Sequence, residues 1–349
     1  MRGAAFQGAF DVRLRTDLPE PEITGPRDAV VRVTRTAICG TDLHAYRGEL
    51  PGFGAGTVLG HEFVGTVVAA GAEVPYQLGQ RVVASDVVAC GRCPACARGW
   101  HYQCPEVTLF GYSTVVGKSL DGGQAEYVRV PYADVVLWAC PDGVTDEQAL
   151  FSSDVLSTGY AAACHANITA GETVAVVGGG TVGLLAGMCA RLVGAAAVVV
   201  ADPVPARRAA AAACGLVPAS PHELAEIVTD VSAGRGAGSV IEAVGSDATL
   251  RLAMATAAAR GTVVAVGAHH SNAAPLDAAA AFARELTLRF VVGDPIVVRD
   301  DVLALIRAGR IDPTVVISHR LPLTEVARAY ELFERREATK VVLIPDDVD

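Results

Sequence analysis

The sequence predicts an α/β protein in which a β-rich domain is joined to a doubly wound parallel sheet. Three observations support this prediction: a length of 349 residues, β-branched runs in the first third, and a glycine-rich turn between a strand and a helix near Gly178. A chain of this length is too long for one ordinary hydrophobic core. We therefore expect two domains.

Composition indicates a globular protein and argues against two classes of partner. Hydrophobic residues make up 51% of the chain and charged residues 19%, which leaves ample apolar surface to bury. The net charge of -10 arises without a long block of like charges, so we expect no nucleic-acid or membrane partner. The one long apolar run, residues 174–200, contains Arg191 and several glycines, which favours a buried strand and helix over a membrane span. Because there is no apolar signal segment and the nine cysteines are not spaced as a disulfide framework, a cytoplasmic protein is expected.

The first expected strands are residues 29–36, 63–69 and 81–84, which are apolar and rich in β-branched residues. The motif Cys39-Gly40-Thr41-Asp42-Leu43-His44 follows the first strand, and Gly60-His61-Glu62 precedes the second. Strand ends are where a rigid scaffold presents functional loops. A thiolate, an imidazole and a carboxylate brought together there would suit a zinc site with one open position.

Four cysteines form the most specific local motif. Cys90, Cys93, Cys96 and Cys104 are separated by two, two and seven residues, with glycine and proline turns between them. Four thiolates fill the coordination sphere of zinc, so this ion would hold the lobe of residues 90–104 together and would not bind substrate. Reduced buried thiols and an iron-sulfur cluster are the alternatives.

Residues 122–128 lead into another expected strand, and residues 146–163 have helical character. Asp154 lies in this helical segment among apolar neighbours. A buried carboxylate needs a partner such as a cation, whereas the alternative is a helix-capping or solvent-facing Asp. The spacing leaves both interpretations open.

From Thr173 the pattern changes to alternating strands and helices. The expected strand Thr173–Val177 runs into the turn Gly178-Gly179-Gly180-Thr181-Val182-Gly183, and a helix follows. Gly178 permits the tight turn, Gly180 lets the backbone approach a pyrophosphate, and Gly183 allows the helix and strand to pack closely. Asp202 ends the next strand about 20 residues later, where a carboxylate can bind a ribose and repel a 2′-phosphate. NAD is therefore favoured over NADP, although Arg207 or Arg208 nearby would suit that phosphate.

Further strands are expected at residues 239–244, 262–266 and 286–292, with a helix at 247–260. The turns Val244-Gly245 and Val266-Gly267 lie at carboxyl ends of strands, where such sheets bind ligands, and His269-His270 is expected in a loop near the cofactor. The remaining expected elements are helices at 300–308 and 323–334 and strands at 315–318 and 340–344. This tail would return to the first domain. We thus expect a catalytic domain at residues 1–155 and 293–349 and a nucleotide-binding domain at 156–292.

These motifs resemble those of the zinc-dependent medium-chain alcohol dehydrogenases over essentially the whole chain. The site pattern is most similar to secondary-alcohol, polyol and threonine-type dehydrogenases, because Asp154 matches an acidic third ligand. The resemblance implies a GroES-like catalytic domain with a zinc lobe and a Rossmann domain that binds NAD.

The resemblance also implies roles for individual residues. Cys39, His61 and Asp154 match the catalytic zinc ligands, and Glu62 matches a ligand that exchanges with water. Thr41 and His44 match a proton relay, Asp42 matches the residue that supports the zinc-bound His, and Tyr112 lies near a substrate-pocket aromatic. The residues expected at the cofactor, of which the first matches a nicotinamide contact, are Thr158, Gly178, Gly180, Thr181, Val182, Gly183, Asp202, Arg207, Val244, Gly245, Val266 and Gly267.

Zinc lowers the pKa of an alcohol and a nicotinamide accepts its hydride, which predicts an oxidoreductase acting on a small alcohol or polyol, or on the ketone or aldehyde in reverse. The alternatives are a reductase of activated C=C or C=N bonds and a nucleotide-binding relative without turnover. The complete set of ligand types argues against both. The apolar strand at 286–292 predicts pairing of sheet edges, and the resemblance implies a homodimer or homotetramer.

Overall fold

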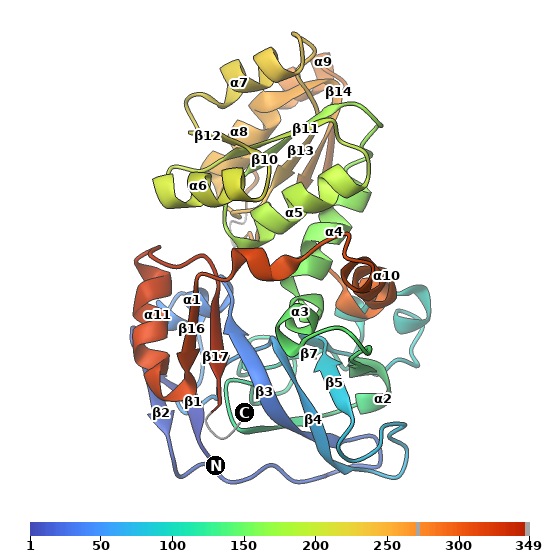
Figure 1. Cartoon of the computed structure of the whole chain (residues 1–349), viewed down its shortest axis with the longest axis vertical. Coiled ribbons are helices and arrows are strands. Elements are labelled where there is room, and N and C mark those ends of the chain that lie inside the picture. Colours follow the sequence, from blue (N-terminus) through green and yellow to red (C-terminus); the bar gives the residue numbers. More distant parts are fainter. Residues whose placement is uncertain (270–272, 346–349) are drawn as a thin grey trace. The chain divides into compact units, whose positions relative to one another are not determined.

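The computed structural model describes residues 1–269 and 273–345, which form two compact units (Figure 1). The first unit joins Met1–Asp154 to the segment that begins at Asp294, and the second unit is Val155–Gly293. Within the described ranges, no helix is both long enough and apolar enough to cross a membrane.

A seven-stranded sheet is the scaffold of the first unit. Its centre is the antiparallel pair β3 (Ala29–Ile38) and β4 (Phe63–Ala70), whose β-branched residues are mostly buried. The strand order is β16 (His319–Pro322), β17 (Val341–Ile344), β3, β4, β5 (Arg81–Ala84) and β9 (Leu137–Ala139), and β8 (Tyr127–Val130) also pairs with β3. Because β17 runs antiparallel to β3 with Val341 opposite Ile38, the C-terminal segment extends the sheet that the N-terminal part begins.

Short strands and helices surround this sheet. The two small antiparallel pairs are β1 (Gly3–Gly8) with β2 (Asp11–Arg15) and β6 (Val87–Val88) with β7 (Thr108–Leu109). The α-helices are α1 (Asp42–Tyr46), α2 (Ala133–Val136), α3 (Asp146–Leu150), α10 (Pro295–Arg307) and α11 (Val326–Glu334). The 3-10 helices are η1 (Cys96–Arg98), η2 (His101–Gln103), η3 (Phe151–Ser153), η4 (Pro313–Val316) and η5 (Leu323–Glu325).

Two hydrophobic clusters hold the first unit together. In one, Phe63 of β4 meets Phe110 edge to face, with ring centroids 5.0 Å apart. In the other, Tyr330 of α11 packs 5.2 Å from Tyr46 of α1 and is completely buried. The Tyr330 hydroxyl donates to Gln124 at 2.9 Å, so the C-terminal helix is tied by both packing and a buried hydrogen bond.

The second unit is a six-stranded parallel sheet with helices. The strand order is β12 (Val217–Ala219), β11 (Ala197–Ala201), β10 (Thr173–Val177), β13 (Ala237–Glu242), β14 (Ala257–Ala265) and β15 (Thr287–Phe290). The helices are α4 (Val155–His165), α5 (Thr181–Leu192), α6 (Pro205–Ala213), α7 (Leu224–Val231), α8 (Asp247–Thr256) and α9 (Ala278–Ala283). This is the doubly wound order of a dinucleotide-binding sheet, with every residue of the central strand β10 buried.

The sequence prediction was wrong about four elements. The helical segment expected at 146–163 is interrupted, because η3 ends at Ser153, Asp154 has a non-helical backbone, and α4 begins at Val155. Ser152 and Ser153 explain the interruption, since their hydroxyls bond to the carbonyls of Ala149 and Leu150 at 2.6 and 2.5 Å and compete with helical bonding. The strand expected at 315–318 lies instead in η4 and in the two residues that join η4 to β16, and the strand expected at 286–292 is shortened to β15. The helix expected at 247–260 ends at Thr256, and its last four residues belong to β14.

Candidate functional site

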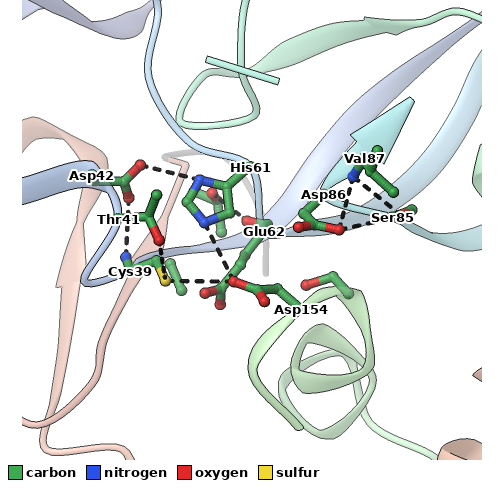
Figure 2. A network of polar contacts seen from close by, with 12 residues as sticks. Cys39, Thr41, Asp42, His61, Glu62, Ser85, Asp86, Val87 and Asp154 are labelled. Carbon is green, nitrogen blue, oxygen red and sulfur yellow. Dashed lines mark hydrogen bonds and ion pairs between the residues drawn. The ribbon is translucent and has the colours of Figure 1, made fainter. Parts of the chain in front are cut away.

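Four potential metal ligands meet in the first unit (Figure 2). Cys39 follows β3, His61 and Glu62 precede β4, and Asp154 follows η3. One ligand atom from each lies within 4.8 Å of the others. The fold therefore brings together all four residues expected as ligands of the open site.

The spacing of these atoms fits a tetrahedral zinc ion. Asp154 Oδ2 lies 3.4 Å from Cys39 Sγ and 3.4 Å from His61 Nε2. Zinc bonds of about 2.0 to 2.3 Å place tetrahedral ligand atoms roughly 3.3 to 3.8 Å apart. Burial raises the pKa of the Cys39 thiol to about 11, and the charges of Asp154 and Glu62 add to the shift, so a bound cation is what would favour the thiolate.

Asp42 orients two members of this cluster. Its carboxylate accepts the Cys39 backbone N–H at 3.0 Å and lies 3.2 Å from His61 Nδ1, and the side chain is 1% exposed. Burial lowers the pKa of His61, but the charge of Asp42 and hydrogen bonds to Asp154, Asp42 and Cys39 outweigh it, so that the pKa lies well above its usual value. With Nδ1 held by Asp42, Nε2 faces the cluster and is the available ligand atom.

Glu62 also bonds to a cation that the sequence analysis did not identify. The Lys340 Nζ donates to both carboxylate oxygens at 2.7 and 2.5 Å, and the two side chains are 0 to 1% exposed. Lys340 directly precedes β17, so the C-terminal segment supplies the positive charge. Burial raises the pKa of Glu62 and the charge of Lys340 acts against this rise.

Thr41 and His44 occupy the start of α1. Thr41 Oγ1 lies 3.7 Å from Cys39 Sγ, at the edge of the metal cluster. His44 Nδ1 lies 2.6 Å from Glu49 Oε2, and Glu49 is 45% exposed on its side chain. Glu49 was missed by the sequence analysis, although a carboxylate five residues beyond a candidate relay His was a usable signal.

The four-cysteine lobe forms a second cluster of ligand atoms. The sulfurs of Cys93 and Cys96 are 3.5 Å apart, those of Cys90 and Cys96 are 4.0 Å apart, and all four sulfurs lie within 4.8 Å of one another. Backbone N–H groups point at these sulfurs, for example Cys96 N at 3.4 Å from Cys93 Sγ. That hydrogen bond is the main cause that lowers the pKa of Cys93 to about 7. A closed tetrahedral zinc site fits this geometry and donor set.

Tyr112 lies in a small apolar cluster beside α1. It is 5% exposed and meets Phe53 edge to face, with ring centroids 6.1 Å apart. Burial raises the pKa of its phenol, and the charge of His61 acts on it in the opposite direction. The phenol is therefore close enough to the metal cluster for the charge of His61 to affect its pKa.

In the glycine turn of the second unit, the backbone at the start of α5 lies directly against the backbone that follows β10. Gly178 has a φ of +104°, which favours glycine, and Thr181 and Val182 open α5. A Cβ on Gly183 would lie 1.8 Å from the Gly178 carbonyl oxygen. No side chain fits there, so α5 begins directly against the end of β10. Gly180 precedes α5 in an extended conformation, and a Cβ there would meet nothing within 4 Å.

Asp202 directly follows β11 and lies beside this turn. Its carboxylate accepts the N–H groups of Gly179 at 2.9 Å and Val204 at 2.8 Å, and the residue is 3% exposed. Arg207 Nη1 lies 3.6 Å from Asp202 Oδ2. A negative charge is thus fixed next to the glycine turn and is partly balanced by Arg207.

The remaining cofactor candidates lie at the ends of β13 and β14 and in α4. The buried Glu242 side chain accepts the N–H groups of Val244 and Gly245, both at 2.9 Å, and lies 3.0 Å from His269 Nε2. Its carbonyl accepts the N–H groups of Val266 and Gly267 at 2.8 and 3.1 Å. The sequence analysis did not identify Glu242 as the residue that joins these two turns. Thr158 is a partly buried residue of α4, and His270 lies outside the described residues.

Two family models match this chain. One describes an alcohol dehydrogenase GroES-like domain and matches residues 25–142, and the other describes a zinc-binding dehydrogenase and matches residues 181–307. A relative in Mycobacterium tuberculosis, named a probable zinc-binding alcohol dehydrogenase, is 39% identical over 100% of this chain and 90% of its own length. The chain belongs to the zinc-dependent medium-chain alcohol dehydrogenase family.

Solved structures of this family have the same fold. The alcohol dehydrogenase of Thermus sp. ATN1 superposes with a TM-score of 0.94 at 38% identity and covers 99% of this chain and 100% of its own. A zinc-binding dehydrogenase from Sinorhizobium meliloti bound to NADP gives a TM-score of 0.84 at 30% identity, with 99% of each chain covered. The expected GroES-like and Rossmann-type fold is confirmed, and the protein is an oxidoreductase of the zinc-type alcohol dehydrogenase kind that acts on small molecules.

Proposed function

We propose that this family member transfers hydride reversibly between NAD(H) and an alcohol or polyol, or the corresponding ketone or aldehyde. The observation that carries the proposal is the convergence of Cys39, His61, Glu62 and Asp154 within 4.8 Å. We assign catalysis to the first unit and NAD binding to the second, because the metal cluster lies in one and the glycine turn in the other.

The side chains at the metal cluster provide a route for the substrate proton. Zinc held by Cys39, His61 and Asp154 would lower the pKa of an alcohol hydroxyl, and bound NAD would accept the hydride. Thr41 Oγ1, at the edge of the cluster, receives the proton, and His44 carries it onward. Glu49 Oε2 holds His44 Nδ1 at 2.6 Å and is half-exposed, so it connects the relay to solvent.

We assign a structural zinc ion to the four-cysteine lobe. Four closely spaced sulfurs leave no position for a substrate, and the small cluster of Ala89, Val107 and the cysteines themselves offers little hydrophobic core. Cysteines that form no disulfides are typical of a reducing compartment, so we place the enzyme in the cytoplasm.

NAD is the proposed cofactor because Asp202 fixes a carboxylate beside the glycine turn. The relative from Sinorhizobium meliloti binds NADP, so the preference must be tested on this chain. Asp202→Gly removes the charge that would repel a 2′-phosphate and releases Arg207 to bind it, which should move the preference toward NADP. The measurement is kcat/KM with each cofactor. A native enzyme that already prefers NADPH would show that Asp202 does not select the ribose.

The experiment that tests the overall function is a screen of alcohols, polyols, ketones and aldehydes with the purified zinc enzyme. Formation or loss of the reduced nicotinamide is followed by its fluorescence with NADH and NADPH. We expect turnover of at least one alcohol and carbonyl pair in both directions. Reduction of an activated C=C or C=N bond without alcohol turnover would replace the proposal with a reductase.

A further inference from the structure

Asp86 is a buried carboxyl near the metal cluster that belongs to neither ligand set (Figure 2). It lies between β5 and β6 and is 7% exposed. Its Oδ1 accepts the Val87 N–H at 2.8 Å, and its Oδ2 accepts the hydroxyl of Tyr102. Burial raises the pKa of Asp86 well above its usual value, and the nearby charge of Asp154 adds to the shift. Both oxygens thus bind groups of the chain itself, as expected of a group that fixes its neighbours.

The backbone of Asp86 holds the residue that precedes the metal ligand Asp154. The Asp86 N–H donates to the Ser153 carbonyl at 3.1 Å, and Ser153 is completely buried. The Ser153 hydroxyl donates to the Leu150 carbonyl at 2.5 Å, which fixes the other end of η3. The position of the Asp154 carboxylate therefore depends on where Asp86 lies.

Tyr102 connects this segment to the four-cysteine lobe. It is the middle residue of η2, between Cys96 and Cys104, and the Cys104 N–H donates to the His101 carbonyl at 3.0 Å. The neighbouring His101 is anchored on Asp294, with its N–H at 3.1 Å and its Nδ1 at 2.9 Å from Oδ2. Burial, followed by the charge of Asp86, raises the pKa of the Tyr102 phenol well above its usual value, so the hydroxyl keeps its proton and donates.

We propose that Tyr102 and Asp86 are positioning residues through which the four-cysteine lobe holds Asp154 in place at the open metal site. The ligand role of Asp154 rests on the proposed function. The contacts form a continuous path from Cys104 and His101 through Tyr102 and Asp86 to Ser153. The lobe then positions a ligand of the open metal site in addition to stabilising its own segment of the chain.

The discriminating variant is Tyr102→Phe, which removes one hydroxyl and keeps the ring. Tyr76→Phe is the matched control. The Tyr76 hydroxyl donates to the Leu137 carbonyl at 2.6 Å in the same unit, and Tyr76 packs against the hydrophobic cluster around Phe63. Metal affinity is measured by chelator competition on the cobalt-substituted protein, since a site with one thiolate and a site with four give different visible spectra.

We expect Tyr102→Phe to weaken metal binding at the open site roughly 10- to 100-fold while the lobe keeps its ion. The value of kcat should fall more than KM rises, because Asp154 moves but the alcohol pocket does not. Tyr76→Phe should leave both quantities unchanged. Equal metal affinity at the open site in the two variants would overturn the proposal.

Asp86→Asn gives a second measurement on the same path. We expect it to weaken the open site as Tyr102→Phe does, and the double variant to lose little more, because both changes break one connection. Fully additive losses would show that the two residues act separately and would overturn the pairing. If Asp86→Asn does not fold, the comparison of the two tyrosine variants decides alone. Metal affinity is measured without turnover, so a native protein inactive on alcohols would contradict the proposed function and leave this test intact.

Discussion

The two cysteine-containing sites differ in the number of ligands that residues of the chain supply. Cys39, His61 and Asp154 leave a fourth position that Glu62 or a small molecule can take, whereas the lobe offers four sulfurs. Under the proposed function, we expect a ligand residue of the open site to act mainly in catalysis and a ligand residue of the lobe to act mainly in folding.

Cys39→Ser should abolish turnover and leave thermal stability close to that of the native protein, because the open site lies on strand ends that other contacts hold. Cys93→Ser should lower Tm, because the lobe loses a ligand and has little core of its own. Metal analysis, initial rates and thermal unfolding measure the difference. Fewer than two zinc ions in the native protein, or equal effects of the two substitutions, would contradict this division.

The buried ion pair of Glu62 and Lys340 is expected to contribute to the stability of the fold. Lys340→Met leaves a carboxylate without its cation at 0% exposure, which should lower the free energy of unfolding by about 3 to 5 kcal/mol. Adding Glu62→Gln should restore much of that loss. Lys118→Met is the control, since Lys118 is 90% exposed and its loss should have little effect. Urea unfolding of the four proteins is the measurement, and equal stabilities of the two Lys variants would contradict it.

Local sequence motifs predicted which single residues are metal ligands, but they did not predict the distant residues that pair with those ligands. Cys39 and His61 were predicted as ligands because each stands at the end of an expected strand, where a rigid scaffold presents functional residues. Lys340 could not be predicted, because 278 residues separate it from Glu62 and a lysine before a strand usually faces solvent. Tyr102 gave no signal either, since its hydroxyl partner Asp86 belongs to a different loop.

The ends of secondary-structure elements determine where the residues of the metal site lie. α3 begins with a capping box in which Thr145 and Gln148 bond reciprocally, and η3 ends at Ser153, directly before Asp154. Apolar periodicity alone predicted one helix through Asp154, because it carries no information about the serine hydroxyls that bond back to the preceding turn. Strands and the glycine turn were easier to predict, since buried β-branched runs and glycines depend on local sequence.

α3 is also joined to β16 by an ion pair whose effect depends on pH. The hydrogen bond from Arg320 lowers the pKa of Glu147 below its ordinary 4.5, with burial acting in the opposite direction. The pair therefore stabilises the fold above pH 4.5, and its contribution is lost as the pH falls through the lowered pKa.

Glu147→Gln should reduce stability at pH 7 by up to about 1 kcal/mol, because the Arg320 side chain is 48% exposed and solvent screens the pair. The difference from the native protein should narrow below pH 4.5 in urea unfolding experiments. Glu325→Gln is the control, since its pair with Arg328 lies within one turn of chain and connects no separate elements. A difference that stays constant with pH would contradict the assignment.

β15 is an edge strand of the six-stranded parallel sheet. Among the described strands it pairs with β14, and Phe290 is 56% exposed on it. The tail strands β16 and β17 pair within the first unit, so they do not extend this edge. An edge strand that exposes a large apolar side chain is normally covered or paired, and we propose a second copy of the chain as its partner.

Light scattering should therefore show at least a dimer, and Phe290→Glu should shift it toward the monomer. Leu78→Glu is the control, because Leu78 is also exposed, at 68%, but lies in the first unit. A native protein at monomer mass across a wide concentration range would reject the oligomer. From the sequence, the apolar strand at 286–292 predicted paired sheet edges and the family resemblance implied a dimer or tetramer, but the length of the tail left open whether the tail would cover this edge.

The return of the last strands to the first sheet has a consequence for how the protein is made on the ribosome. The residues of the second unit emerge as one continuous segment, so that unit can fold while translation is still under way. β17 and Lys340 emerge only after the second unit, and until then β3 lacks one of its strand partners and the charge of Glu62 lacks its cation. Nascent chains arrested before residue 340 should therefore contain a folded second unit and a metal site whose Glu62 still lacks its cation. The metal site would then be completed only after the second unit has folded.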